Sequence, residues 1–259
     1  MYDFEELHAA HDRLWAAIAA CLRTSTDIPD RLTRTAELLP AWQDPRLLLG
    51  QTCGYPLVTL LGPRVRLVLT PIYDAPGCEG AWHRSAVVVR ADDDVADLGG
   101  LRGRRCALNA WDSNTGMNLL RALVAPLARG GRFFGEVAVS GSHRGSLAMV
   151  ADGAADVASV DCVTLALLTR IDPLLTARIR VLGWSAKSPG LPMITSTTTD
   201  DATLEALQAA LAEVFRDPAL ADLRGALLLA GYEVLPYETY AVVGRLEAEA
   251  AGHGYPRLA

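Results

Sequence analysis

Hydrophobic and polar positions follow two different periodicities along most of the chain. Apolar residues spaced three and four apart predict helices, whereas short aliphatic and β-branched runs predict strands. The predicted helices cover residues 4–23, 30–39, 56–61, 117–128, 144–151, 162–170, 202–215 and 218–230. The predicted strands cover residues 46–52, 65–73, 82–90, 105–109, 134–140, 157–160, 179–185 and 191–196. Strands and helices therefore alternate through the middle of the chain.

This alternation predicts an α/β protein whose sheets are parallel and covered by helices on both faces. Ligands of such proteins bind beyond the carboxyl ends of the strands. Polar residues gather at three predicted strand ends that precede helices, namely Asp112–Gly116, Ser140–His143 and Asp161. Because three clusters at equivalent positions rarely arise by chance, we predict that they form one site.

Two of these clusters are typical of anion-binding helix starts. Asp112-Ser113-Asn114-Thr115-Gly116 and Ser140-Gly141-Ser142-His143 combine small hydroxyl, amide and glycine residues directly before a helix. Unpaired backbone N–H groups and the positive end of the helix dipole attract anions at such positions. The alternative is that Ser113 and Ser142 only cap their helices, and it stays open for each cluster taken alone.

The charge and hydropathy of the chain limit the kinds of partner and the cellular compartment that we expect. The net charge of −6 argues against nucleic acid or a membrane surface, but a local group of N–H donors can still bind an anion. The apolar runs are too short to span a bilayer. The first residues lack the basic start and apolar stretch of a secretory signal. We therefore expect a cytoplasmic protein, or a periplasmic or other extracytoplasmic one if a signal has been removed.

The cysteines and acidic residues do not indicate a metal or cofactor. The five cysteines are Cys21, Cys53, Cys78, Cys106 and Cys162. They form no Cys-x-x-Cys pair and do not stand at zinc-like spacing from the histidines, which predicts reduced thiols that mostly fill the core. The run Asp92-Asp93-Asp94 is interpreted as a solvated turn. We expect no cofactor and no metal site.

The three clusters, together with Gly50–Pro56 and Thr70–Tyr73, resemble the phosphate/phosphonate-binding component of ABC transporters. The resemblance covers residues 47–195, with the five motifs in the correct order. It implies a type 2 periplasmic-binding-protein fold, in which each of two α/β lobes has a mainly parallel sheet flanked by helices. Lobe one would comprise residues 1–88 and 186–259, lobe two would be the insertion 89–185, and the ligand site would lie in the cleft between them.

The resemblance also implies the ligand-binding residues, and most of them have a plain structural alternative. The implied set is Tyr55, Tyr73, Ser113, Asn114, Thr115, Gly116, Ser142, His143 and Asp161. The tyrosines would close the site from lobe one, or else belong to the core. His143 would donate to the anion, or else lie at the surface. Asp161 would accept a hydrogen bond from a protonated ligand oxygen, or else cap the helix that begins at Cys162.

The selectivity expected of Asp161 follows from elementary chemistry. Hydrogen phosphate and phosphonate monoanions carry an O–H group at neutral pH, whereas sulfate does not. A carboxylate in a dry site accepts a bond from a protonated oxyanion and repels an unprotonated one. A mismatch would leave a buried charge unpaired, at a cost of several kcal/mol.

We therefore expect a non-catalytic solute-binding protein whose hinge closes over phosphate, phosphite or phosphonate, with an ABC permease as partner. One alternative is a cytoplasmic enzyme on the same fold, such as a chorismate dehydratase-like step of cofactor biosynthesis, with His143 and Asp161 as acid and base. A ligand sensor is a further alternative. The fold would normally open with a strand, of which Met1-Tyr2-Asp3 is expected to be the remnant.

Overall fold

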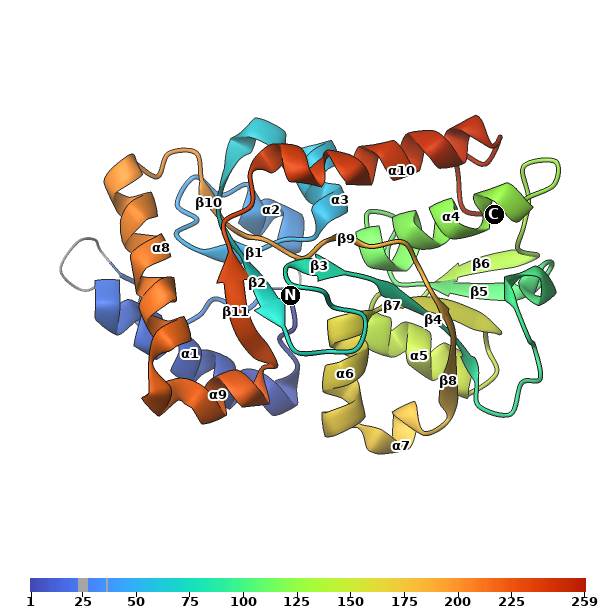
Figure 1. Ribbon diagram of the computed structural model, residues 1–259, viewed down its shortest axis with the longest axis horizontal. Helices are drawn as coiled ribbons and strands as arrows, with labels where there is room; N and C mark the ends of the chain where they lie inside the picture. Colours follow the sequence, from blue (N-terminus) through green and yellow to red (C-terminus); the bar gives the residue numbers. More distant parts are fainter. Residues whose placement is uncertain (23–27, 36) are drawn as a thin grey trace.

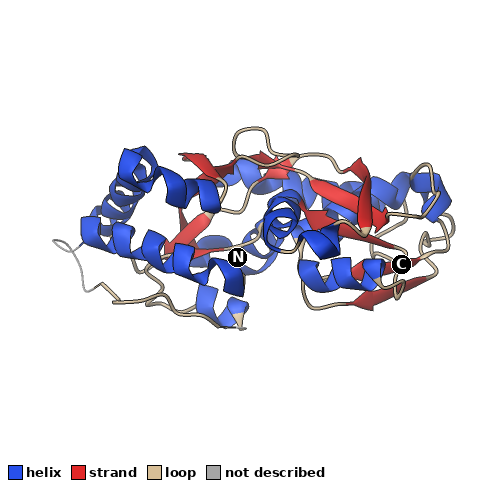
Figure 2. Ribbon diagram, turned by 90° about the horizontal axis from the view of Figure 1, so that it is seen from below, coloured by secondary structure: helices blue, strands red, loops and turns tan. Residues whose placement is uncertain are grey.

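A computed structural model describes residues 1–22, 28–35 and 37–259 of the chain. Two α/β lobes lie beside each other, each built on its own sheet (Figure 1). The molecule is elongated along the line that joins the lobes, and the N-terminus lies between them (Figure 2). The expected two-lobed α/β architecture is confirmed.

Lobe one contains a four-stranded sheet in the order β1-β10-β2-β11, with every neighbouring pair antiparallel. Its strands are β1 (Gly50–Gln51), β2 (Val65–Tyr73), β10 (Met193–Ser196) and β11 (Leu229–Glu233). Its helices are α1 (His8–Leu22), α2 (Leu38–Trp42), α3 (Gly54–Pro56), α8 (Asp201–Arg216) and α9 (Ala221–Ala226).

Lobe two contains a five-stranded sheet in the order β6-β5-β7-β4-β8. Its strands are β4 (Ser85–Arg90), β5 (Arg105–Leu108), β6 (Glu136–Val139), β7 (Val157–Asp161) and β8 (Ile179–Trp184). The first three strands in this order are parallel, whereas β4 runs antiparallel to both β7 and β8. Its helices are α4 (Leu119–Val124), α5 (His143–Ala151), α6 (Cys162–Ile171) and α7 (Pro173–Thr176).

Three further features connect the lobes. The short strands β3 (Trp82–His83) and β9 (Ser188–Pro189) pair with each other between the two sheets (Figure 1). Helix α10 (Ala241–Gly252) leaves lobe one and packs along α4 of lobe two. One apolar cluster also joins the lobes, because it contains Tyr73 of β2 as well as Cys162 and Leu167 of α6. The lobes are therefore in direct contact.

The prediction of mainly parallel sheets is wrong for lobe one and holds only for part of lobe two. Alternation along the chain describes elements that follow each other, such as those from β5 to β7. Strands β10 and β11 instead return to lobe one after the chain has passed through lobe two, and they run opposite to β2.

The predicted lobe boundaries also need correction. A boundary at residue 88 would divide β4, whose paired residues from Ser85 to Arg90 all belong to the sheet of lobe two. The end of the chain was expected in lobe one, but Tyr255 and Leu258 are buried in the core of lobe two. The carbonyl of Ala259 accepts a hydrogen bond from the Phe133 N–H at 2.7 Å, which ties the last residue to that lobe.

Several element predictions are wrong in detail. Residues 30–35 are not helical, and α2 begins only at Leu38, so that Pro40 lies in its first turn, where no N–H partner is lost. The helix predicted over 218–230 ends at Ala226, because the residues from Leu229 pair with β2. Helix α10 was not predicted. The residues Met1–Asp3 form no strand.

Candidate functional site between the lobes

Sheet order in lobe two decides where the three predicted polar clusters lie. Strands β5, β6 and β7 are parallel, so their carboxyl ends meet at one edge of the sheet. The π-helical turn η5 (Asn114–Asn118) follows β5, α5 follows β6, and α6 follows β7. The three clusters are therefore neighbours at the same edge, as the chain pattern predicts.

Residues 113–116 of the first cluster are buried, whereas Asp112 is exposed, and most polar groups of the buried part are already hydrogen bonded. The hydroxyl of Ser113 accepts a bond from the Gly116 N–H at 2.9 Å and so caps η5. Asn114 donates from its backbone N–H to Cys53 Sγ at 3.3 Å and from Nδ2 to Ser188 Oγ at 3.0 Å. These bonds attach the start of η5 to lobe one and to β9.

Gly116 permits the close packing of this turn. A Cβ atom at this position would lie 1.7 Å from the Asn109 Oδ1 atom and 3.1 Å from the His143 ring. A larger residue would therefore displace Asn109 and crowd the His143 ring.

In the second cluster, Ser142 and His143 have different surroundings. The exposed Ser142 accepts a bond from the Gly145 N–H at 2.9 Å and acts as a helix cap. The Nε2 atom of His143 lies 3.1 Å from the Thr115 hydroxyl, whereas its Nδ1 atom is buried without a hydrogen-bond partner. Burial lowers the pKa of His143 despite the nearby Asp161 carboxylate, so the ring is neutral at pH 7.

Asp161 is the most deeply buried acidic group at this edge, with 2% of its surface exposed. Its Oδ1 atom accepts a bond from the Thr164 N–H at 2.9 Å and caps α6. Its Oδ2 atom has no hydrogen-bond partner and lies 3.9 Å from His83 Nδ1. Burial opposes ionisation, but the interaction with protonated His83 outweighs it and lowers the pKa of Asp161. The carboxylate is therefore charged at neutral pH.

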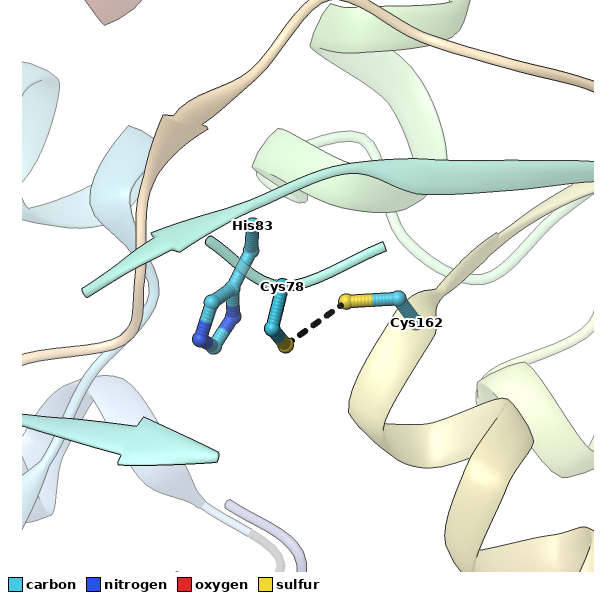
Figure 3. Close-up of side chains that lie close together, drawn as sticks. All are labelled: Cys78, His83 and Cys162. Carbon is cyan, nitrogen blue, oxygen red and sulfur yellow. Dashed lines mark hydrogen bonds between the residues drawn. The ribbon is translucent and has the colours of Figure 1, made fainter. Parts of the chain in front are cut away.

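His83 lies 3.9 Å from the Asp161 carboxylate. It is also close to two cysteines, Cys78 and Cys162 (Figure 3). Burial opposes its protonation, but the charges of Asp161 and Cys78 outweigh burial and raise the pKa of His83 to about 9. Neither ring nitrogen has a partner within hydrogen-bond distance. The Sγ atoms of Cys78 and Cys162 are 3.5 Å apart, and this contact together with His83 lowers the pKa of Cys78.

The lobe-one side of the site is aromatic. Tyr73 accepts a hydrogen bond from Gln51 Nε2 at 3.1 Å, and its ring packs edge-on against Tyr2 with centroids 5.2 Å apart. The Tyr2 hydroxyl is buried without a partner, and burial together with the Asp161 charge raises its pKa well above the usual value. A small cavity of about 60 Å³ touches Tyr2, Gln51, Tyr73 and Leu167.

Tyr55 points to another part of the molecule. Its hydroxyl donates to Glu247 Oε1 at 2.6 Å on α10, and the same carboxylate pairs with Arg121 at 3.2 Å. This hydroxyl is therefore engaged at the junction of α3, α4 and α10, not beside Asp161.

The structure thus brings four of the predicted side chains into one region, namely Tyr73, Thr115, His143 and Asp161. Ser113, Asn114 and Gly116 build the turn beneath them, while Ser142 and Tyr55 are directed elsewhere. Sequence reasoning missed Tyr2, Gln51, Cys78 and His83 as members of this region. Gln51 lies within the Gly50–Pro56 motif, which was a usable signal, but no spacing rule connects His83 with Asp161.

Comparison with known proteins identifies the family. Residues 11–240 match the family described as ABC transporter, phosphonate, periplasmic substrate-binding protein. No curated protein sequence matched the chain. No helix in the described ranges combines the length and apolar character needed to cross a bilayer.

Solved structures share the fold at low sequence identity. A binding-protein component of an ABC phosphonate transporter from Pseudomonas aeruginosa aligns with a TM-score of 0.78 and 12% identity, over 98% of this chain and 85% of that one. A methylphosphonate complex from Prochlorococcus marinus gives 0.73 and 12%, over 94% of both chains. A Xanthomonas citri protein bound to ATP gives 0.70 and 17%, over 95% of both chains.

The family match covers most of the chain, including both lobes and all three polar clusters. Its members are substrate-binding components of transporters, which supports the expected non-enzymatic role and not the alternative of a biosynthetic enzyme. The chain belongs to the family of periplasmic phosphonate-binding proteins of ABC transporters.

Proposed function

We propose that this protein binds a protonated phosphorus oxyanion, namely phosphate, phosphite or a small phosphonate, between its lobes and presents it to an ABC permease. The observation that carries this proposal is the Oδ2 atom of Asp161, which is buried, charged and without a hydrogen-bond partner. A ligand O–H group would supply the missing donor.

Two further groups fit the remaining oxygens of such an anion. A neutral imidazole donates from one nitrogen and accepts at the other. When the Thr115 hydroxyl donates to His143 Nε2, the Nδ1–H group of His143 remains available as a donor. The Tyr2 hydroxyl, which is also buried without a partner, is a second donor close to Asp161.

Ligand entry requires the lobes to separate. Asp161, Thr115 and Tyr73 are all buried, and an apolar cluster packs β2 of lobe one against α6 of lobe two. Hinge movement about the segments that cross between the lobes, on either side of the β3–β9 pair, would open a route to these residues, and ligand binding would favour closure.

Thermal unfolding of ligand-free protein tests the proposal. A ligand that binds only the native state raises Tm as its concentration increases. We expect an increase with phosphate, phosphite or methylphosphonate and none with sulfate at the same ionic strength. The absence of an increase with every phosphorus oxyanion would refute the proposed function.

Replacement of Asp161 by asparagine tests the source of selectivity. Asparagine retains an oxygen to cap α6 but removes the charge, so the preference for a protonated oxyanion over sulfate should fall by about tenfold or more, equivalent to about 1.4 kcal/mol. The exposed change Asp92→Asn is the matched control and should retain the preference. Unchanged selectivity in Asp161→Asn would show that Asp161 does not read the ligand proton.

A further inference from the structure

Three side chains from separate segments converge beside the proposed anion site. Cys78 lies in the loop after β2, His83 belongs to β3, and Cys162 begins α6 of lobe two. One potential ligand atom from each lies within 4.8 Å of the other two. Figure 3 shows the Cys162 side chain extending toward Cys78, with the His83 ring beside Cys78.

We propose that Cys78, His83 and Cys162 form a zinc site that joins the segment from the loop after β2 to strand β3 with helix α6 of lobe two. Two thiolates and one imidazole are ligand types that zinc binds strongly. Ligands held at about 2.0–2.3 Å in a tetrahedron lie about 3.5–3.8 Å from one another. The two sulfur atoms are already 3.5 Å apart, so a small shift of the His83 ring would complete the arrangement.

The surroundings of His83 provide an independent argument for a ligand. Its side chain is 1% exposed, yet neither ring nitrogen forms a hydrogen bond. Buried polar groups without partners are rare because each costs free energy. A metal ion would satisfy one nitrogen, and the Asp161 carboxylate, with Oδ2 3.9 Å from Nδ1, adds negative charge that favours a cation nearby.

Two glycines allow these side chains to approach one another. A Cβ atom on Gly77 would lie 2.6 Å from the Trp184 ring and 3.0 Å from Cys162 Cβ, and its φ of +97° also favours glycine. A Cβ atom on Gly190 would lie 2.7 Å from His83 Nε2. Larger residues at these positions would push Cys78 or His83 away from the cluster.

Zinc binding also explains the surroundings of His83 better than a Cys78–Cys162 disulfide does. Oxidation of Cys78 and Cys162 would join their sulfur atoms but leave both His83 nitrogens without partners. Zinc binding needs no oxidant: the protons that the two thiols and the His83 imidazolium carry pass to solvent, and the ion accepts an electron pair from each sulfur and from one His83 nitrogen. The fourth tetrahedral position is left for water or another exogenous ligand.

The experiment uses the full chain, reduced, treated with a chelator and kept free of phosphate. Zinc added against a chromophoric chelator should bind at one ion per chain. Cobalt(II) added in its place should give the thiolate charge-transfer bands and the intense visible bands of a tetrahedral site. Because no oxyanion is present, this result does not depend on the proposed solute-binding function.

Substitutions identify the ligands. Loss of an outer-shell partner of a metal ligand weakens binding by about 10–100-fold, so loss of a ligand itself should weaken it at least as much. We expect this for Cys78→Ser, His83→Gln and Cys162→Ser, with weaker cobalt–thiolate bands in the two serine variants. Cys21→Ser changes an exposed thiol on α1 and should leave zinc binding intact.

Three results would overturn the proposal. One is reduced wild-type protein that binds no zinc and shows no cobalt–thiolate band. Another is zinc binding that survives Cys78→Ser and His83→Gln in variants whose circular dichroism is native. The third is a Cys78–Cys162 disulfide in the isolated protein whose reduction restores no metal binding.

Discussion

The starts of α5 and α6 have the same local design but different surroundings. Ser142 follows β6 and Asp161 is the last residue of β7, and each accepts a bond from a backbone N–H three residues later at 2.9 Å. Strand β6 is at the edge of the sheet and Ser142 is exposed, whereas Asp161 ends the interior strand β7 and is buried. The order of the strands thus decides which cap also faces the cleft.

The comparison shows how one residue can serve two purposes. A carboxylate has two oxygens, so Asp161 can cap α6 with Oδ1 and still present Oδ2 to a ligand. The Ser142 hydroxyl is at the surface, and its structural role is capping alone. The two interpretations of Asp161 as a cap and as a ligand residue are therefore compatible.

The two helix starts should differ most in how much their caps contribute to the free energy of unfolding. Asp161→Ala removes the cap and leaves His83 buried without its carboxylate, which should lower the free energy of unfolding by about 3–5 kcal/mol. Ser142→Ala removes only an exposed cap and should cost about 1 kcal/mol. Urea unfolding measures both values. Equal losses would mean that Asp161 acts as a cap alone.

A smaller effect is the contribution of His143, at the start of α5, to the pH dependence of the free energy of unfolding. An unfolded histidine has a pKa of about 6.5, and the folded value is lower because of burial. Between these values the unfolded chain binds more protons, so His143 makes stability fall as the pH drops below about 6.5, by up to about 1.4 kcal/mol per unit of pKa difference.

Urea unfolding of wild type and His143→Gln at pH 5 and pH 7 measures this contribution. Glutamine does not titrate, so the variant should lose less stability on acidification than wild type. An equal loss in both proteins would contradict a half-buried, neutral imidazole and would show that His143 is as accessible to solvent as Ser142.

The smallest expected effect concerns the two tyrosines on the opposite side of the cleft. Tyr73→Phe removes the acceptor of the Gln51 bond and should cost about 1 kcal/mol, whereas Tyr2→Phe removes a hydroxyl without a partner and should leave unfolding nearly unchanged. Urea titrations compare the variants without ligand. If Tyr2→Phe also leaves oxyanion affinity unchanged, Tyr2 is not a ligand donor.

Much of the candidate site in lobe two could be predicted because it depends on local patterns. The residues of β7 and the helix after it are adjacent in the chain, so a run of apolar residues followed by Asp161 indicates a buried strand, a cap and a helix. The same holds for the turn after β5, where Ser113 caps η5. Such signals need no knowledge of distant residues.

The other side of the site could not be predicted in this way. Tyr2 reaches the cleft because the first residues pack between Tyr73 and α6, although they form no strand. His83 lies close to Cys162 only because β4 pairs with β7. This antiparallel pairing places the residues before β4 next to the carboxyl end of β7. These contacts arise from pairing between segments that are far apart in the sequence, and short-range periodicity does not predict such pairing.

Local sequence patterns are sufficient to predict the elements of lobe two, the three polar helix starts and the resemblance to phosphonate-binding proteins. The antiparallel sheet of lobe one, the docking of the C-terminus on lobe two and the difference between Ser142 and Asp161 arise only in the folded chain. Caps and periodicity depend on neighbours within a few residues, whereas burial and charge at a site depend on which strands lie side by side.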